Sequence, residues 1–203
     1  MVSLTVRRRE EHRRMPWKNG LGVTEEIAIA PEGATLADPF LWRLSSALVQ
    51  ADGPFSLFPG YDRTLVVVEG AGMILDADGK LTTIARLDAP FAFPGEASVT
   101  SALTEGPIRD FNVMALRGKV RSRTRLFRPS EGTGGEAFVT APAGETTIVV
   151  CLDGSCAAAV AETDARPVFL RGLDALFVTE VTDDAKIILG GNGVAVVVHI
   201  AVL

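Results

Sequence analysis

The chain is a succession of short runs of β-branched, aromatic and other apolar residues, and no segment shows a convincing helical period beyond a turn or two. Clusters of Gly, Pro and Asp separate the runs at short intervals, as they do in barrels and sandwiches. This pattern predicts an all-β fold with strands over residues 40–49, 63–75, 85–95, 109–118, 146–152, 175–181, 186–190 and 194–203. The stretch 129–144 is rich in Gly, Pro and small residues, which predicts a linker or crossover between two halves.

The two halves repeat short motifs at a nearly constant spacing. Residues 67–72 (VVEGAG) match 151–156 (CLDGSC), and residues 87–92 (LDAPFA) match 173–178 (LDALFV), with offsets of 84 and 86 residues. A shared offset in two places indicates an internal duplication of a β unit.

Composition limits the class of protein and its surroundings. With 203 residues, 47% of them hydrophobic, the chain can form one large β domain or two small, closely packed ones. No apolar run reaches the roughly 18 residues of a membrane helix, and no apolar segment follows the charged N-terminus, so neither a membrane span nor a secretory signal is expected. Two cysteines make no disulfide framework and favour a cytoplasmic location. Two histidines, His12 and His199, exclude a His-rich metal site; His12 lies in an Arg-rich stretch expected to be exposed.

A basic segment stands out in a chain of net charge −5. Residues 117–128 (RGKVRSRTRLFR) carry five Arg and one Lys with no acid, and cations alternate from 117 to 125. This period of two predicts a strand with one positive face. The face is interpreted as solvated or as an edge protected against aggregation; nucleic acid is not expected as a partner, since interleaved stacking aromatics are absent.

Several motifs together resemble the HutD/Ves family, a bicupin family of the cupin superfamily. They are residues 16–24 (PWKNGLGVT), 42–45 (WRLS), 52–63 (DGPFSLFPGYDR), 93–95 (FPG) and 109–114 (RDFNVM). The resemblance implies an N-terminal cupin-like barrel over 1–128 that carries the motifs. It also implies a degenerate C-terminal half over 129–203, closely packed with the first as one globular unit. The family usually has Gly where this chain has Leu21, and it is associated with bacterial histidine utilisation.

The resemblance also bears on metal binding. Many cupins hold a divalent metal with three His and one Glu, and alignment on the Glu69–Gly70 element places those positions on Leu57, Pro59, Arg63 and Ser98. These side chains make no metal site, so no metal and no cofactor are expected. A guanidinium in place of a carboxylate favours an anion, and Arg offers a two-pronged match to a carboxylate.

The candidate ligand-binding residues are Trp17, Lys18, Asn19, Arg43, Ser45, Arg63 and Asn112. In the Trp17–Asn19 loop, Lys supplies a cation, Asn supplies a donor and an acceptor, and Trp can cover a planar ligand. Arg43 and Ser45 alternate with apolar neighbours and therefore share one face of a strand.

Each of these candidates has a structural alternative. Trp17 is equally compatible with a core position and Lys18 with a solvated one, and Arg43 could face solvent. Arg63 could form an ion pair with Asp62, Glu69 or Asp110.

No nucleophile–base set is evident, and His199, within the apolar run VVVHIAV, is interpreted as a core or barrel-edge histidine. Asp110 and Glu69 could provide paired carboxylates, but nothing in the pattern supports that role. The leading hypothesis is therefore metal-free binding of a small carboxylate metabolite, with urocanate or N-formylglutamate suggested by the resemblance, to sense or buffer it. The alternatives are a hydrolase or isomerase acting on the same class of compound, and a scaffold that dimerises without a ligand. A homodimer is compatible with each hypothesis.

The two cysteines flank a predicted turn. A two-residue hairpin turn at Asp153–Gly154 would place Cys151 opposite Cys156, where a disulfide is geometrically conceivable. Free thiols are expected in a reducing compartment.

Overall fold

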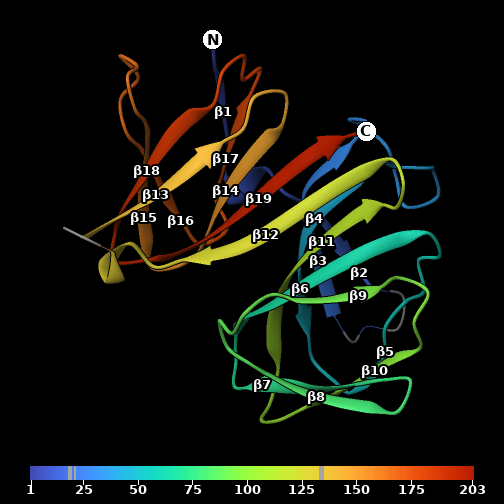
Figure 1. Ribbon diagram of the computed structural model, residues 1–203. Helices are drawn as coiled ribbons and strands as arrows, with labels where there is room; N and C mark the ends of the chain where they lie inside the picture. The colour runs from blue at the N-terminus through green and yellow to red at the C-terminus, as the bar shows by residue number, and fades with distance from the viewer. Residues whose placement is uncertain (18–19, 21, 133–134) are drawn as a thin grey trace. The chain divides into compact units, whose positions relative to one another are not determined.

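The computed structural model describes residues 1–17, 20, 22–132 and 135–203, and strands account for its regular structure apart from short 3-10 helices (Figure 1). In chain order the elements are β1 (Ser3–Arg7), η1 (Arg9–Glu11), β2 (Arg13–Pro16), β3 (Gly22–Ala30), β4 (Trp42–Val49), β5 (Gly53–Pro54), β6 (Tyr61–Glu69), β7 (Gly72–Ala77), β8 (Lys80–Ala85), β9 (Phe91–Pro94), β10 (Val99–Leu103), β11 (Ile108–Leu116), β12 (Val120–Phe127), η2 (Pro129–Glu131), β13 (Glu136–Ala141), β14 (Thr146–Asp153), β15 (Ser155–Val160), β16 (Val168–Arg171), β17 (Ala175–Thr179), β18 (Ala185–Gly191) and β19 (Val194–Val202). No helix in the described residues has the length and hydrophobicity needed to span a bilayer.

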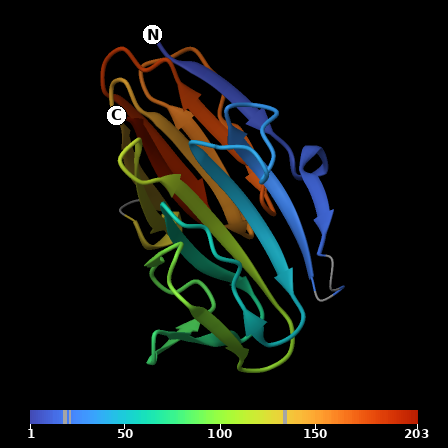
Figure 2. The same cartoon turned by 90° about the vertical axis from the view of Figure 1, so that its right-hand side faces the viewer.

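The chain forms two compact units, each made of two sheets. Residues 12–120 form one unit, with a six-stranded sheet (β2-β3-β4-β11-β6-β9) and a four-stranded sheet (β5-β10-β7-β8). Residues 1–11 and 121–203 form the other, with a five-stranded sheet (β1-β17-β14-β19-β12) and a four-stranded sheet (β13-β18-β15-β16). The N-terminal strand β1 belongs to this second unit because it pairs antiparallel with β17 (Figure 2).

Each unit has an apolar core between its two sheets, because alternate residues of each strand point inward. In the 12–120 unit the core contains Val49, Leu65, Val67, Met73, Leu75, Ile84, Phe93, Val99 and Ile108. In the second unit it contains Val139, Ala141, Val149, Cys151, Cys156, Ala158, Val160, Leu170, Leu176, Val178, Val181, Ile187, Leu189, Ala195 and Val197.

The duplication indicated by the sequence repeat is visible in the turns before β9 and β17. Leu87 and Leu173 both adopt a positive φ, 58° and 73°, which is uncommon for a branched side chain. The matched hydrogen bonds are Leu87 N to Val67 O (2.8 Å) and Leu173 N to Cys151 O (2.7 Å), with Ala85 N to Asp88 Oδ2 (2.9 Å) and Arg171 N to Asp174 Oδ2 (3.3 Å). The same strained turn therefore occurs once in each half, and the predicted all-β, duplicated fold is confirmed.

Three predicted segments are wrong in their boundaries. The run 85–95 is not one strand, because it contains the turn at Leu87 between β8 and β9. The run 63–75 is two strands, β6 and β7, because Gly70 and Gly72 have positive φ and break the first ladder. The segment 129–144 holds η2 and the edge strand β13, whose Val139 and Ala141 point into the core. Composition predicts a linker here, but small apolar residues at alternate positions allow the segment to form strand β13.

The basic segment is only partly a strand. Arg117 lies in the turn before β12 and forms ion pairs with Asp62 and Glu96 at 2.8 and 2.7 Å. Residues 121, 123 and 125 are exposed arginines on β12, at an edge of the five-stranded sheet. This part agrees with the interpretation of a solvated edge.

The cysteine and histidine predictions have mixed outcomes. β14 and β15 belong to different sheets, so the predicted hairpin ladder is wrong, and Cys151 and Cys156 are buried free thiols. His199 lies on β19 with its Nδ1 3.0 Å from Thr147 Oγ1, and burial lowers its pKa. His12 is buried rather than exposed.

We predict that Gly95→Ala destabilises the protein. Gly95 N donates to Tyr61 O at 2.7 Å and Gly95 O accepts from Phe58 N at 2.8 Å, so the backbone is enclosed on both sides. An added Cβ would overlap Phe58 O and lie 2.8 Å from Tyr61 O. We expect urea denaturation to show a loss of about 1–3 kcal/mol in the free energy of unfolding. Gly53→Ala is the control, because an added Cβ meets nothing within 4 Å there; equal effects of the two variants would contradict the prediction.

Candidate functional site

The space between the two sheets of the 12–120 unit widens into a cavity of about 630 Å³, a typical size for a small-molecule site. Its lining comes from one sheet mainly through β4 and β11, with fewer residues from β2, β3 and β6, and on the other side from β5, β10 and the segment after β5. The lining residues are Met15, Pro16, Trp17, Thr24, Leu36, Arg43, Ser45, Ala47, Val49, Ala51, Asp52, Gly53, Pro54, Phe55, Ser56, Phe58, Arg63, Ser101, Asp110, Asn112 and Met114.

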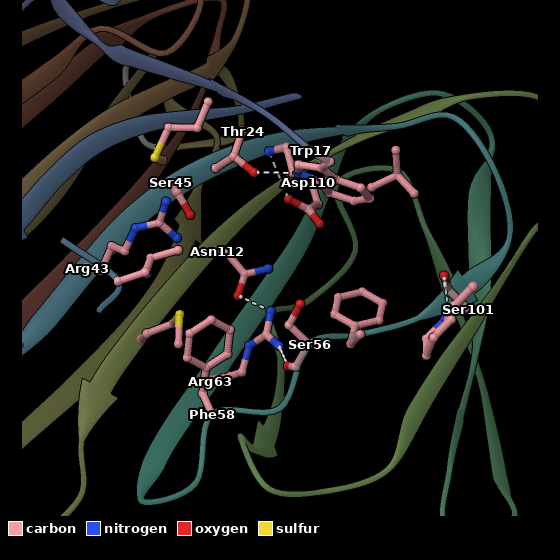
Figure 3. A pocket seen from close by; sticks show the side chains of 18 of the residues that line it. Trp17, Thr24, Arg43, Ser45, Ser56, Phe58, Arg63, Ser101, Asp110 and Asn112 are labelled. Atoms are coloured by element: carbon pink, nitrogen blue, oxygen red, sulfur yellow. Dashed lines mark hydrogen bonds between the residues drawn. The ribbon is translucent and has the colours of Figure 1, made fainter. Parts of the chain in front are cut away.

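Strand alternation brings the polar lining residues onto one face of the six-stranded sheet. Asn112 of β11 pairs with Ser45 of β4, and Met114 pairs with Arg43 of β4 on one side and Arg63 of β6 on the other. The inward faces of three neighbouring strands therefore carry two arginines around an amide and a hydroxyl (Figure 3).

Arg63 is a buried cation held by neutral groups. Its side chain donates from Nη2 to Asn112 Oδ1 at 3.1 Å and from Nη1 to Ser56 O at 3.2 Å (Figure 3), while Nε has no hydrogen-bond partner in the described part of the chain. Its guanidinium carbon lies 5.0 to 5.6 Å from the ring centroids of Phe55, Phe58 and Phe93. Burial lowers the pKa of Arg63 to about 10, so it stays charged near neutral pH.

Arg43 differs because a carboxylate balances its charge. Its Nε donates to Glu26 Oε2 at 2.6 Å, and the same carboxylate receives Arg13 Nη2 at 2.9 Å. The Nη2 of Arg43 has no hydrogen-bond partner among the described residues. The charge of Arg43 is therefore compensated, whereas no carboxylate within the described residues lies at ion-pair distance from Arg63.

Asp110 is a carboxyl group within the same cavity lining. It is 2% exposed, and its Oδ1 accepts a hydrogen bond from Ala47 N at 3.1 Å. Burial raises the pKa of Asp110 to about 6, although the positive charges of Arg63, Arg109 and Arg43 oppose this shift. The carboxyl group is therefore largely ionised at pH 8 and largely protonated at pH 5.

Trp17 forms part of the cavity wall. Its indole Nε1 donates to Thr24 Oγ1 at 2.9 Å, which fixes the ring (Figure 3). A Cβ on Gly22 would lie 2.8 Å from the indole ring, so glycine permits this close approach. The other predicted residues of this loop, Lys18 and Asn19, lie outside the described residues.

The cavity brings together five of the residues selected from the sequence: Trp17, Arg43, Ser45, Arg63 and Asn112. Two proposed ion-pair partners of Arg63 bind other arginines: Asp62 pairs with Arg117, and Glu69 with Arg109. The cupin metal positions Leu57, Pro59 and Ser98 are not in the cavity lining.

The sequence reasoning did not select Asp110 as a site residue. The available signal was its spacing of two from Asn112, which places both side chains on one face of β11. Its chain neighbour Arg109 faces the other side of the strand, pairs with Glu25 at 3.5 Å and is absent from the cavity lining.

A divalent metal does not fit these donors. Among the described residues, no three His, Cys, Asp or Glu side chains converge to hold a metal ion. The two guanidinium groups of Arg43 and Arg63 also make the cavity unfavourable for a cation.

Comparisons with known proteins agree with this fold. The HutD family model matches residues 9–196. An uncharacterised 21.2 kDa protein in the hutC 3′ region of Pseudomonas putida is 44% identical over 128 residues, which are 63% of this chain and 66% of that protein, just under two thirds of its length. A crystal structure of a conserved protein of unknown function from Pseudomonas aeruginosa PAO1 is 33% identical, with a TM-score of 0.86 over 98% of this chain and 99% of that one.

Two further solved structures are similar. HutD from Pseudomonas fluorescens SBW25, in a formate condition, is 31% identical, with a TM-score of 0.81 over 99% of this chain and 100% of that one. A cupin 2 conserved barrel domain protein from Leptotrichia buccalis is 11% identical, with a TM-score of 0.53 over 90% of this chain and 89% of that one, and shows the fold alone. The chain therefore belongs to the HutD family, and its fold is that of a bicupin.

Proposed function

We propose that the cavity of the 12–120 unit binds a small carboxylate metabolite directly, without a metal. The observation that carries the proposal is Arg63, a buried guanidinium that has neutral hydrogen-bond partners and no carboxylate at ion-pair distance within the described residues. We draw the ligand from histidine utilisation, as urocanate or N-formylglutamate, because relatives carry the name HutD or lie in a hutC region. The protein would sense or buffer this metabolite.

The energetics of Arg63 support an anionic ligand. Burial of a charge costs free energy unless the charge is paired, and the neutral groups of Asn112 and Ser56 compensate only part of that cost. A carboxylate beside the guanidinium would supply the missing counter-charge through short, charge-assisted hydrogen bonds. The free protein is therefore destabilised at the point where the ligand would bind.

The remaining lining suits a small, partly planar acid. Trp17 and Phe55 offer flat apolar surfaces, and Ser45 offers a hydroxyl. Asn112 gives its Oδ1 to Arg63, which leaves its amide N–H groups to donate to a ligand oxygen. In this proposal the motif-bearing half, predicted over 1–128, holds the site, and the half predicted over 129–203 is structural.

The alternative is an enzyme acting on the same class of compound. It is favoured by one observation, the buried Asp110, whose raised pKa of about 6 is compatible with proton transfer near neutral pH. Binding and turnover are separated by whether the ligand is recovered intact.

The first experiment is calorimetric titration of metal-free protein with urocanate, N-formylglutamate, glutamate and formate, followed by chemical analysis of each sample. We expect saturable binding of at least one of the first two, with the ligand unchanged. Formation of product would establish the enzyme alternative, and absence of binding and of product with all four would refute the proposed ligand class. In that case the remaining hypothesis would be a scaffold protein that dimerises without a ligand.

We predict that Arg63→Met weakens carboxylate binding by about 10- to 100-fold, because charge-assisted hydrogen bonds to the ligand are lost while side-chain volume is largely kept. Arg125→Met, which changes an exposed arginine on β12 outside the cavity lining, is the matched control and should leave affinity unchanged. Wild-type affinity in Arg63→Met would remove Arg63 from the site.

The same substitution should stabilise the ligand-free protein. A buried charge that lacks a counter-ion is destabilising, so Arg63→Met should raise the free energy of unfolding by about 1–3 kcal/mol in urea denaturation. Arg125→Met should change it little. A large loss of stability in Arg63→Met would instead mean that the guanidinium holds the fold together.

Binding of a simple carboxylate should depend on pH through Asp110. Above its pKa of about 6 the ionised carboxyl group repels an anion in the cavity, and below it the neutral form does not. Formate, which stays ionised over this range, should bind about tenfold more tightly at pH 5.5 than at pH 8. NMR titration at both pH values would measure this. Asp110→Asn should bind formate with nearly equal affinity at the two pH values. If the wild-type pH dependence of formate affinity persisted in that variant, Asp110 would not be the group responsible for it.

A further inference from the structure

A carboxyl group inside a proposed anion site needs an explanation that carboxylate binding alone does not supply. We infer that Asp110 accepts a hydrogen bond from an N–H group of the ligand, so the site selects carboxylates that carry an N–H donor a few bonds away. This inference rests on the proposed function and adds the class of compound that the cavity distinguishes.

The spacing on β11 sets the two contact points. Asp110 and Asn112 are two residues apart on the same face, and alternate Cα atoms of a strand are roughly 7 Å apart. Arg63 bonds to Asn112, so its guanidinium marks the carboxylate end and Asp110 marks the other end. Figure 3 shows the side chains of Asp110, Asn112 and Arg63 in succession along this wall of the cavity. A compact ligand with a carboxylate and a nearby N–H group spans that separation.

Hydrogen-bond capacity identifies the Asp110 side chain as the acceptor. An ionised carboxylate has about four acceptor positions, and among the described residues the Asp110 carboxylate accepts one hydrogen bond, from Ala47 N. The neighbouring amide oxygen of Asn112 is already bonded to Arg63. A ligand N–H beside Asp110 would therefore satisfy a buried acceptor that the protein leaves with spare capacity.

The same carboxylate excludes other compounds. A ligand that places an ether, ester or N-methyl group beside Asp110 would meet an ionised acceptor without donating to it, which leaves a buried charge poorly solvated. The charged groups that act on Asp110 are Arg63 and Arg43 on neighbouring strands and the adjacent Arg109. With its pKa at about 6, Asp110 is ionised at pH 8, where the selection should be strongest.

The test compares ligand pairs that differ at the N–H position. Urocanate is paired with 3-(2-furyl)acrylate, which has the same acrylate and a five-membered ring without N–H. N-formylglutamate is paired with its N-methyl derivative. Calorimetry at pH 8 on the wild-type protein should show at least a tenfold preference for the N–H member of the pair that binds, a ratio that needs no variant.

Two variants assign the preference to the residue. Asp110→Asn should abolish or reverse it, because the side chain can keep an acceptor toward Ala47 N and then turns an N–H₂ group toward the ligand. Asp52→Asn is the matched control, since Asp52 also lines the cavity and its Oδ1 accepts a backbone N–H, from Leu103 at 2.7 Å. The control should keep the wild-type ratio.

The outcomes separate this inference from the proposed function. Equal affinity of both members for the wild-type protein, or a preference that survives in Asp110→Asn, would overturn the role of Asp110 while carboxylate binding stands. No binding of any of the four acids would overturn both. Thermal unfolding of Asp110→Asn confirms that a lost preference comes from a folded protein.

Discussion

The burial of the Arg63 guanidinium is the constraint around which the N-terminal unit is arranged. A strand that would otherwise continue the core, with Leu65 and Val67 fully buried, places a cation at its next inward position. Three phenylalanine rings surround the guanidinium, and a side-chain amide and a carbonyl oxygen accept hydrogen bonds from it, but no carboxylate in the described chain lies at ion-pair distance from it. The apolar core between the sheets therefore ends at Arg63, and the cavity lies beyond this residue.

Other arginines of the six-stranded sheet form ion pairs with carboxylates, which sets them apart from Arg63. Glu26 receives both Arg13 and Arg43, so the second cavity arginine has a counter-charge. Arg109 interacts with Glu25 and Glu69, while its chain neighbour Asp110 lies in the cavity lining. Because side chains alternate along each strand, Arg109 and its acidic partners lie outside the cavity lining. The lining itself contains Arg63, which has no carboxylate at ion-pair distance among the described residues. A buried arginine with no carboxylate at ion-pair distance costs stability, and such a cost is commonly tolerated at functional sites.

The sequence predicts those features that depend on periodicity. Alternation identified Arg43 and Ser45 as one face of a strand, and the repeated Leu-Asp step marked two turns with the same positive φ at Leu87 and Leu173. It could not identify β13, since Gly and small residues hide a strand whose inward positions are filled by Ala141 and its neighbours.

Pairing between distant strands was also beyond the sequence. The Asp153–Gly154 step suggests a hairpin, but the strands on either side pair in different sheets, because long-range ladders outweigh the local turn signal. For the same reason the local signal for Asp110 is weak: its spacing from Asn112 places both on one strand face, but its neighbours Arg63 and Ala47 lie on the two flanking strands.

The duplication explains why the first half has a polar cavity between its sheets where the matching positions of the second half form a packed core. In the first half, β6 and β11 pair Leu65 with Asn112 and Val67 with Asp110. At the matching offset of 84 residues along the first strand, β14 and β19 pair Val149 with Val197 and Cys151 with Ala195.

All four of these C-terminal residues are fully buried members of the apolar core. The position that matches Arg63 is Thr147, whose hydroxyl lies 3.0 Å from the His199 ring nitrogen. The same strand pairing therefore occurs in both halves. In the second half the inward positions are mainly apolar and form a packed core. In the first half they include Arg63, Asn112 and Asp110, and they line a polar cavity. Because backbone pairing is equivalent in the two halves, the difference between the polar cavity and the packed core lies in a few side chains: the first half has Arg63, Asp110 and Asn112 where the second has Thr147, Ala195 and Val197.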